Sequence, residues 1–202
     1  MGCCERSCCW PCCNVCAMIM LAVTFCLLVW GTSGLLWLSI NNDHIGLQKA
    51  SLKQSNLGEF TFDKCPPSIK SFCDKWESAG KGALAMIIIA IIALVPAAIF
   101  AVLFFIPEDS CGPAPTNGMI ATLGAFLCEA IVAFLCFVIA IQYAKGTDGA
   151  RGNAVLSLNY IGVIIAGILM VIAAAIHLTF GTCAKDVRDG SSDIGGDNSG
   201  KV

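Results

Sequence analysis

Cysteine is the residue type with the most evident chemistry in this sequence, and its distribution is uneven. The 202-residue chain has 14 cysteines, and half of them fall in the opening segment MGCCERSCCWPCCNVC, directly before a long apolar run. Thiols beside a membrane-spanning helix lie within reach of membrane-embedded acyltransferases. Acyl chains on this segment would hold it against the bilayer. We therefore predict S-palmitoylation within residues 1–16, at Cys3, Cys4, Cys8, Cys9, Cys12, Cys13 and Cys16.

Other chemistries fit parts of the same segment. Gly2 suggests N-myristoylation, but the pattern requires Ser or Thr at position 6, where this chain has Arg6. The Cys9-x2-Cys12 and Cys13-x2-Cys16 spacings are those of tetrahedral zinc sites, although no histidine accompanies them. Unmodified thiols are a further interpretation. We predict no metal and no cofactor.

A second pair of cysteines lies apart from this cluster, in the segment GEFTFDKCPPSIKSFCDKW. A disulfide between Cys65 and Cys73 would close a short loop, which the chain-entropy relation values at about 2.6 kcal/mol. The preceding EFTFD alternates apolar and polar residues, as a half-exposed strand does. Disulfides persist in oxidising compartments. The pattern predicts a small stapled extracellular lobe, which either caps the helices or recognises a partner.

Glu129 is the only acidic residue inside a long apolar run. An ionised carboxylate at the bilayer centre costs about 2.5 kcal/mol or more, so intramembrane acids mark candidate functional sites. Three interpretations stay open: a structural hydrogen bond, a role in ion or proton movement, and pairing with another subunit. His177 is not expected to be its partner, because counting from the ends of their apolar runs places the two residues roughly 12 Å apart in depth.

The elements that position these residues follow from the composition. The chain is 57% hydrophobic and 13% charged, with a mean hydropathy of +0.79. Four apolar runs are long enough to cross a hydrocarbon core of about 30 Å. The sequence thus predicts an all-α membrane protein, a four-transmembrane-helix bundle with a small disulfide-stapled lobe that could include a short β element. The predicted divisions are a cysteine-rich arm at 1–16, a transmembrane domain at 17–180 (spans 17–40, 82–106, 118–144 and 155–180), an extracellular loop at 41–81 and a disordered polar tail at 181–202.

Small residues recur at four-residue spacing on two of these runs. Such stripes let helix backbones approach closely within a membrane. They serve either internal packing, which we favour, or lateral oligomerisation. The residues are Ala93, Ala97 and Ala101 on the second run, and Gly162 and Ala166 on the fourth.

Two features disagree about orientation. Loop 41–81 and the third loop together carry most of the Lys and Arg residues, which favours an outside N-terminus under the positive-inside rule. The N-terminal cysteines suit cytoplasmic acylation, and the Cys65/Cys73 pair suits an oxidising compartment. We give the cysteines more weight and predict cytoplasmic N and C termini in an integral protein of the plasma membrane.

Several residues around the first loop resemble a known family. They are Trp30, the stretch Gly34-Leu35-Leu36-Trp37, Cys65 and Cys73, in a four-span chain whose largest loop follows the first helix. This arrangement resembles the superfamily of claudins and peripheral myelin proteins. The resemblance implies an extracellular β-sheet and a role in cell–cell contact, paracellular barriers or auxiliary subunits of channels.

Charge and motifs narrow the function classes. A net charge of −2 gives no electrostatic basis for nucleic-acid binding. The HExxH, GxSxG, P-loop and GxGxxG motifs are absent from the sequence. We predict a non-enzymatic structural, adhesion or accessory subunit, whose partners are the lipid bilayer, other membrane proteins or further copies of itself. The alternative is an oligomeric ion or proton channel subunit that uses Glu129.

Overall fold

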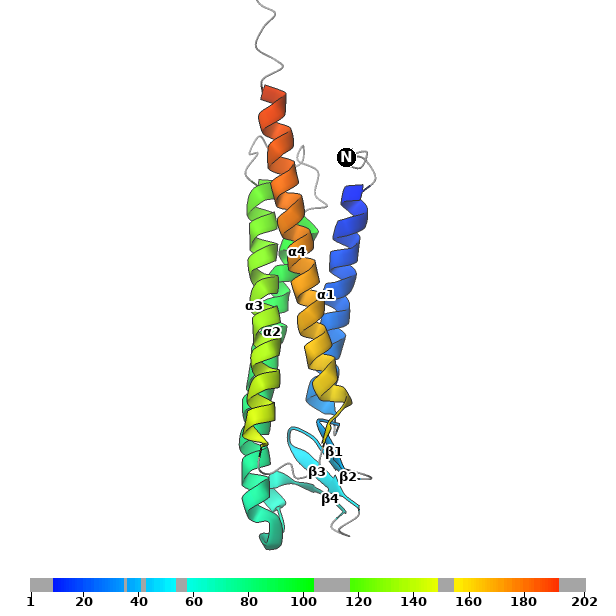
Figure 1. The fold of residues 1–202 in the computed structure, drawn as a ribbon, viewed down its shortest axis with the longest axis vertical. Helices are drawn as coiled ribbons and strands as arrows, with labels where there is room; N and C mark the ends of the chain where they lie inside the picture. The colour runs from blue at the N-terminus through cyan, green and yellow to red at the C-terminus, as the bar shows by residue number, and fades with distance from the viewer. Residues whose placement is uncertain are drawn as a thin grey trace, which may run out of the picture.

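Four long helices form most of the fold. The computed structural model describes residues 9–34, 36–40, 43–53, 58–103, 117–148 and 155–192. The helices run side by side, with a small β-sheet at one end (Figure 1). Each contains a stretch long and apolar enough to cross a membrane. The predicted four-helix membrane bundle is confirmed, and its helices are α1 (Cys9–Ser33), α2 (Lys70–Leu103), α3 (Asn117–Gly146) and α4 (Leu158–Ser192).

The helices pack in a definite order. α2 packs along α3, α3 along α4, and α4 along α1, whereas the contact between α1 and α2 is less extensive. Large apolar side chains such as Ile19, Ile92 and Phe134 are exposed on the outside of the bundle. Exposed apolar surface of this extent suits contact with lipid.

α1 ends at Ser33, and not at residue 40 as its apolar run predicts. The last turn of α1 is capped from outside: Asn159 Nδ2 donates to the Trp30 carbonyl at 3.1 Å, and Trp37 Nε1 donates to the Gly31 carbonyl at 2.8 Å. The chain turns at Gly34, where any side chain would overlap that of Asn159. Trp37 and Leu38, which follow the turn, are fully buried beside the sheet.

The other helices also depart from the apolar runs. α2 begins at Lys70, well before the predicted residue 82, and α4 runs on to Ser192, past the predicted end at residue 180. Residues 181–192, predicted to be disordered, are therefore helical, while 193–202 lie outside the described residues. Hydropathy marks the limit of the lipid core, whereas backbone hydrogen bonding can continue into the polar phase.

The sheet has five antiparallel strands in the order β4-β3-β2-β1-β5. Four strands come from the loop between α1 and α2, and β5 comes from the segment between α3 and α4, which the sequence assigned to the fourth span. In the register of β1 with β5, Leu38 lies opposite Leu156. The lobe, defined here as this sheet with the disulfide segment, thus joins two loops. Its strands are β1 (Leu38–Ile40), β2 (Asp43–Ile45), β3 (Lys49–Leu52), β4 (Gly58–Thr61) and β5 (Val155–Leu156).

The lobe is fastened to the beginning of α2. The predicted disulfide is confirmed: Cys65 and Cys73 are bonded, and Cys73 lies in the first turn of α2. Phe62 is buried against Trp76, with 6.3 Å between ring centroids. The Leu47 carbonyl reaches the surface of α2 at Gly80, where a side chain would collide with it. These contacts make the lobe a rigid extension of the bundle.

Candidate functional site

Glu129 is paired with His177, which corrects the sequence-based expectation. Glu129 Oε2 lies 2.8 Å from His177 Nδ1. The expectation assumed that the apolar runs of the third and fourth spans end at the same level. α4 instead extends past the start of α3 at Asn117 (Figure 1), and the contact itself shows that Glu129 and His177 lie at one level of the bundle.

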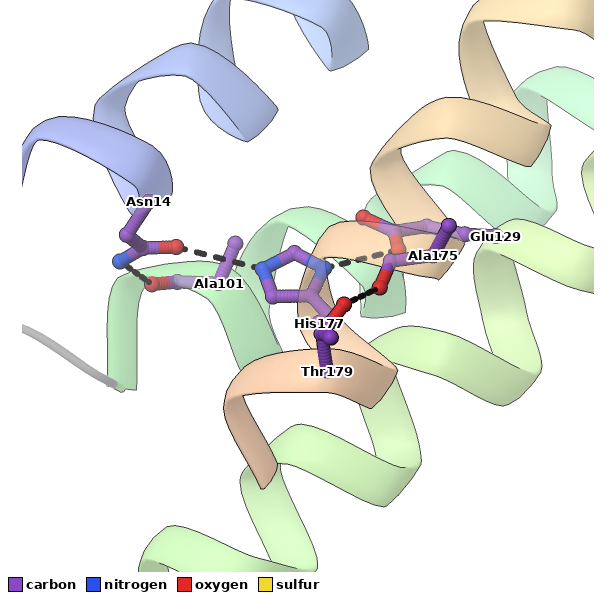
Figure 2. A network of polar contacts seen from close by, with 6 residues as sticks. All are labelled: Asn14, Ala101, Glu129, Ala175, His177 and Thr179. Carbon is purple, nitrogen blue, oxygen red and sulfur yellow. Dashed lines mark hydrogen bonds and ion pairs between the residues drawn. The ribbon is translucent and has the colours of Figure 1, made fainter. Parts of the chain in front are cut away.

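A third residue, Asn14 of α1, extends this pair (Figure 2). His177 Nε2 lies 3.3 Å from Asn14 Oδ1, and Asn14 Nδ2 donates to the Ala101 carbonyl at 3.1 Å. The four groups come from four different helices. One chain of polar contacts therefore runs from α2 through α1 and α4 to α3, and we call these four residues the polar chain.

The side chains of the polar chain are almost completely buried. Asn14 is 5% exposed, His177 3% and Glu129 0%. Polar groups without partners in the bilayer interior cost several kcal/mol each, so mutual pairing accounts for their presence here. Glu129 Oε1 is an exception, since it has no hydrogen-bond partner among the residues that the structure describes. Thr179 lies nearby but donates to the Ala175 carbonyl of its own helix (Figure 2).

Sequence reasoning missed Asn14 because it lies within the cysteine-rich segment, which was treated as an arm outside the bundle. The structure starts α1 at Cys9, so Asn14 is already inside a helix. The available signal was the rarity of such groups: an amide, a carboxyl and an imidazole occur in helices that are otherwise strongly apolar. In a membrane, isolated groups of this kind are expected to find each other.

The cysteines predicted to be acylated fall into three sets. Cys3, Cys4 and Cys8 lie outside the described residues. Cys9, Cys12 and Cys13 belong to α1, so this part of the predicted arm continues the first helix. Cys16 is an exposed free thiol on the same helix.

The small residues of the predicted stripes face the interior of this single chain. Ala97 and Ala101 of α2 are buried, and Ala93 is half-buried. A side chain added at Gly162 would approach the Trp30 ring at 3.5 Å, which places this part of α4 against α1, and Ala166 is buried as well. Their arrangement is that of internal helix packing.

Comparison with protein families and with curated proteins found no match.

Within the described parts of the chain, no group of three or more His, Cys, Asp or Glu side chains is placed to hold a metal ion. The class of protein therefore follows from the fold and the site: a four-helix membrane protein with a stapled β lobe and a buried polar chain.

Proposed function

We propose that this protein is a non-enzymatic tetraspan that acts as a structural, adhesion or accessory subunit of a membrane assembly. The observation that carries the proposal is the lobe, in which strands from two loops form one sheet that the Cys65–Cys73 disulfide closes against α2. A surface that is already rigid loses little conformational entropy when it meets a partner. The partners are other membrane proteins or further copies of the chain.

The edge strand β4 gives this lobe a polar face. Its residues are mostly exposed, and Glu59 accepts a hydrogen bond from Lys49 Nζ at 2.6 Å. Both side chains are about half exposed. Charged groups at the rim of an interface contribute to partner choice and association rate more than to affinity. Such a face suits recognition of a protein outside the membrane.

The interior of the bundle supports a role without catalysis. A general acid or base must lie within hydrogen-bond reach of its substrate. Glu129 and His177 are instead buried and committed to each other. Their arrangement favours stabilisation of the bundle over acid–base chemistry on a bound molecule.

The proposal includes sidedness and lipid attachment. The lobe is extracellular, both termini are cytoplasmic, and the protein resides in the plasma membrane. The disulfide supports an oxidising compartment for the lobe. The opposite end of the bundle carries the cysteines at the start of α1, and the exposed thiol of Cys16 supports S-palmitoylation there.

The resemblance to the claudin and peripheral myelin protein superfamily is part of the proposal. It is supported by the position of the sheet, which follows the first helix, and by Trp37, which joins that sheet to the end of α1. The functions implied are adhesion, barrier formation or an auxiliary role beside a channel.

Photo-crosslinking of the full chain in its native membrane tests the proposal. A photoreactive residue replacing Lys53 or Glu59, both exposed on the lobe, should give a discrete crosslinked product with a membrane protein. The same residue at Phe134, which is exposed on α3, is the matched control and should capture lipid. The product from the lobe should weaken in the Cys65→Ser/Cys73→Ser variant. A lobe that yields no protein adduct at either position would overturn the proposal.

A second function, an ion or proton channel subunit, is favoured by one observation. Glu129 Oε1 lacks a partner among the described residues, and carboxylate–histidine pairs occur in intramembrane proton relays. Liposomes containing the protein and a pH-sensitive dye separate the two functions. An accessory subunit should give the leak of protein-free liposomes, whereas a channel should give a flux that Glu129→Gln reduces.

A further inference from the structure

The directions of the hydrogen bonds in the polar chain can be assigned from one end. The Ala101 carbonyl is only an acceptor, so the Asn14 group facing it must be the amide NH2. The Asn14 oxygen then points at His177 Nε2 and accepts from it. His177 Nε2 must therefore carry a hydrogen whenever all contacts of the polar chain are made.

This assignment fixes the number of hydrogens between His177 and Glu129. With Nε2 protonated, a neutral imidazole has a bare lone pair at Nδ1, which can accept only from a protonated Glu129. If Glu129 is instead a carboxylate, Nδ1 must be protonated and the ring is an imidazolium. Both forms hold one proton between Nδ1 and Oε2, and both have zero net charge.

Once that proton is removed, no placement of the remaining hydrogens satisfies every contact of the polar chain. A carboxylate facing a bare Nδ1 sets two acceptors 2.8 Å apart. Moving the remaining ring hydrogen to Nδ1 repairs this contact but sets bare Nε2 against the Asn14 oxygen. Turning the Asn14 amide over then sets its oxygen against the Ala101 carbonyl. One contact is lost in every case, and a net negative charge is left in the bundle.

We propose that Glu129 and His177 form a binding site for one buried proton, and that its occupancy locks the start of α1 to the other three helices. Asn14 is the residue through which α1 joins the polar chain, and it lies between Cys13 and Cys16. The locked segment is therefore the cysteine-rich beginning of α1. The site is independent of any partner of the lobe.

The charged and titratable groups around Glu129 and His177 show that a change of proton occupancy there can be assigned to this pair. From α1 the uncharged Asn14 contacts His177, and Asn14 in turn donates to the Ala101 carbonyl of α2. On α3 the adjacent titratable group is the Cys128 thiol, and the nearest charged residue in sequence, Lys145, lies about 24 Å away along the helix. On α4 the nearest charged residues are Lys185 and Asp186, about 12 Å further along the helix.

Histidine nitrogen NMR tests the proton count directly. The chain has two histidines, so His44→Asn leaves His177 as the only labelled ring. In the full chain in lipid nanodiscs, we expect Nε2 to stay protonated and Nδ1 to show the shift of a shared hydrogen. Glu129→Gln should retain Nε2–H and give a bare, accepting Nδ1. A neutral ring with its hydrogen on Nδ1 would overturn the proposal.

Hydrogen exchange of the start of α1 tests the lock. Raising the pH from about 7 to 10 should speed exchange of this segment in the wild type by about tenfold beyond the intrinsic pH effect, as the loss of a hydrogen bond predicts. Glu129→Gln supplies an amide hydrogen that pH does not remove, so it should lack this extra acceleration. Both proteins contain the same thiols, which controls for cysteine ionisation. Equal acceleration in the two proteins would contradict the lock, and Asn14→Leu should exchange fast at both pH values.

Discussion

Trp37 shows how a single residue can organise the end of the bundle that carries the sheet. Its indole nitrogen caps α1 through the Gly31 carbonyl, while its ring lies 4.7 Å from that of Tyr143 on α3 and 6.4 Å from that of Tyr160 on α4. The side chain is fully buried. One residue thereby connects three helices at the point where the sheet begins.

Substitution of Trp37 should separate its packing from its hydrogen bond. Trp37→Phe keeps most of the ring and should cost about 1–3 kcal/mol, because the Gly31 carbonyl loses its donor. Trp37→Ala should cost about 3–5 kcal/mol through the cavity that it leaves. Denaturant unfolding in mixed micelles measures both. Trp30→Phe is the control and should cost less than Trp37→Phe, since Trp30 is 42% exposed; the reverse order would contradict this role for Trp37.

At the residue scale, the sequence predicted a pair of residues close together in the chain but not a pair on two different helices. The Cys65–Cys73 disulfide and the burial need of Glu129 both followed from residue type and context. The partner of Glu129 did not, because apolar runs do not report how far one helix is shifted along its neighbour. Asn14 was missed for a related reason: its segment was defined by its cysteines, although its backbone belongs to α1.

Glycines in α2 contribute to the contact between the helix and the lobe, because the absence of a side chain lets another backbone approach closely. Gly80 of α2 is buried under the backbone of the loop that precedes β3, whereas Gly82 on the same helix is exposed, with open space where a side chain would lie. The two glycines thus separate the effect of close approach from the effect of helix propensity.

Gly80→Ala and Gly82→Ala should therefore have opposite effects. An added methyl at Gly80 meets the Leu47 carbonyl, which cannot move without shifting the sheet, so we expect a loss of about 1–3 kcal/mol. Gly82→Ala should be neutral or should stabilise the protein by up to about 1 kcal/mol, because alanine favours the helix. Thermal unfolding and limited proteolysis of the lobe measure the two variants. Equal behaviour would show that the lobe does not rest on α2 at Gly80.

Loss of the disulfide should loosen the lobe while the bundle persists. Cys65→Ser/Cys73→Ser removes a loop constraint worth about 2.6 kcal/mol. The resulting protein should be cut faster by protease within residues 41–81 and keep its helical circular dichroism. Reduced wild-type protein serves as the control and should behave like the variant. Loss of helical signal together with the lobe would mean that the two parts fold as one unit.

At the element scale, the four spans were predictable because apolar runs of this length are typical of membrane-spanning helices and rare in soluble proteins. The strands were predicted only in part. The EFTFD alternation indicated β4, but β1 and β5 were hidden within apolar runs that had been assigned to helices. Leu38 lies opposite Leu156 across the sheet and is fully buried there, and hydropathy alone cannot distinguish that use of an apolar residue from contact with lipid.

The whole molecule has two chemically different ends. The sheet and disulfide lie at one end, while the start of α1 and the end of α4 lie at the other (Figure 1). The charge distribution and the cysteines make opposite predictions about which end faces the cytoplasm.

Protease protection in sealed, right-side-out vesicles decides between them. With the lobe outside, tags at both termini should resist digestion, and the lobe should be cut once the disulfide is reduced. Detergent should then expose the tags. Digestion of the tags in intact vesicles, with the lobe protected, would show that the positive charges set the orientation.

The capping of α1 by Asn159 bears on biogenesis. Asn159 and His177 both belong to α4, which leaves the ribosome after α1, yet they satisfy groups on α1. Until α4 has been inserted, the Trp30 carbonyl and the Asn14 oxygen lack these donors in a medium that offers no substitute. α1 therefore carries unsatisfied polar groups until α4 is inserted. A chain truncated before α4 would leave those groups exposed to the quality-control machinery that removes unassembled spans.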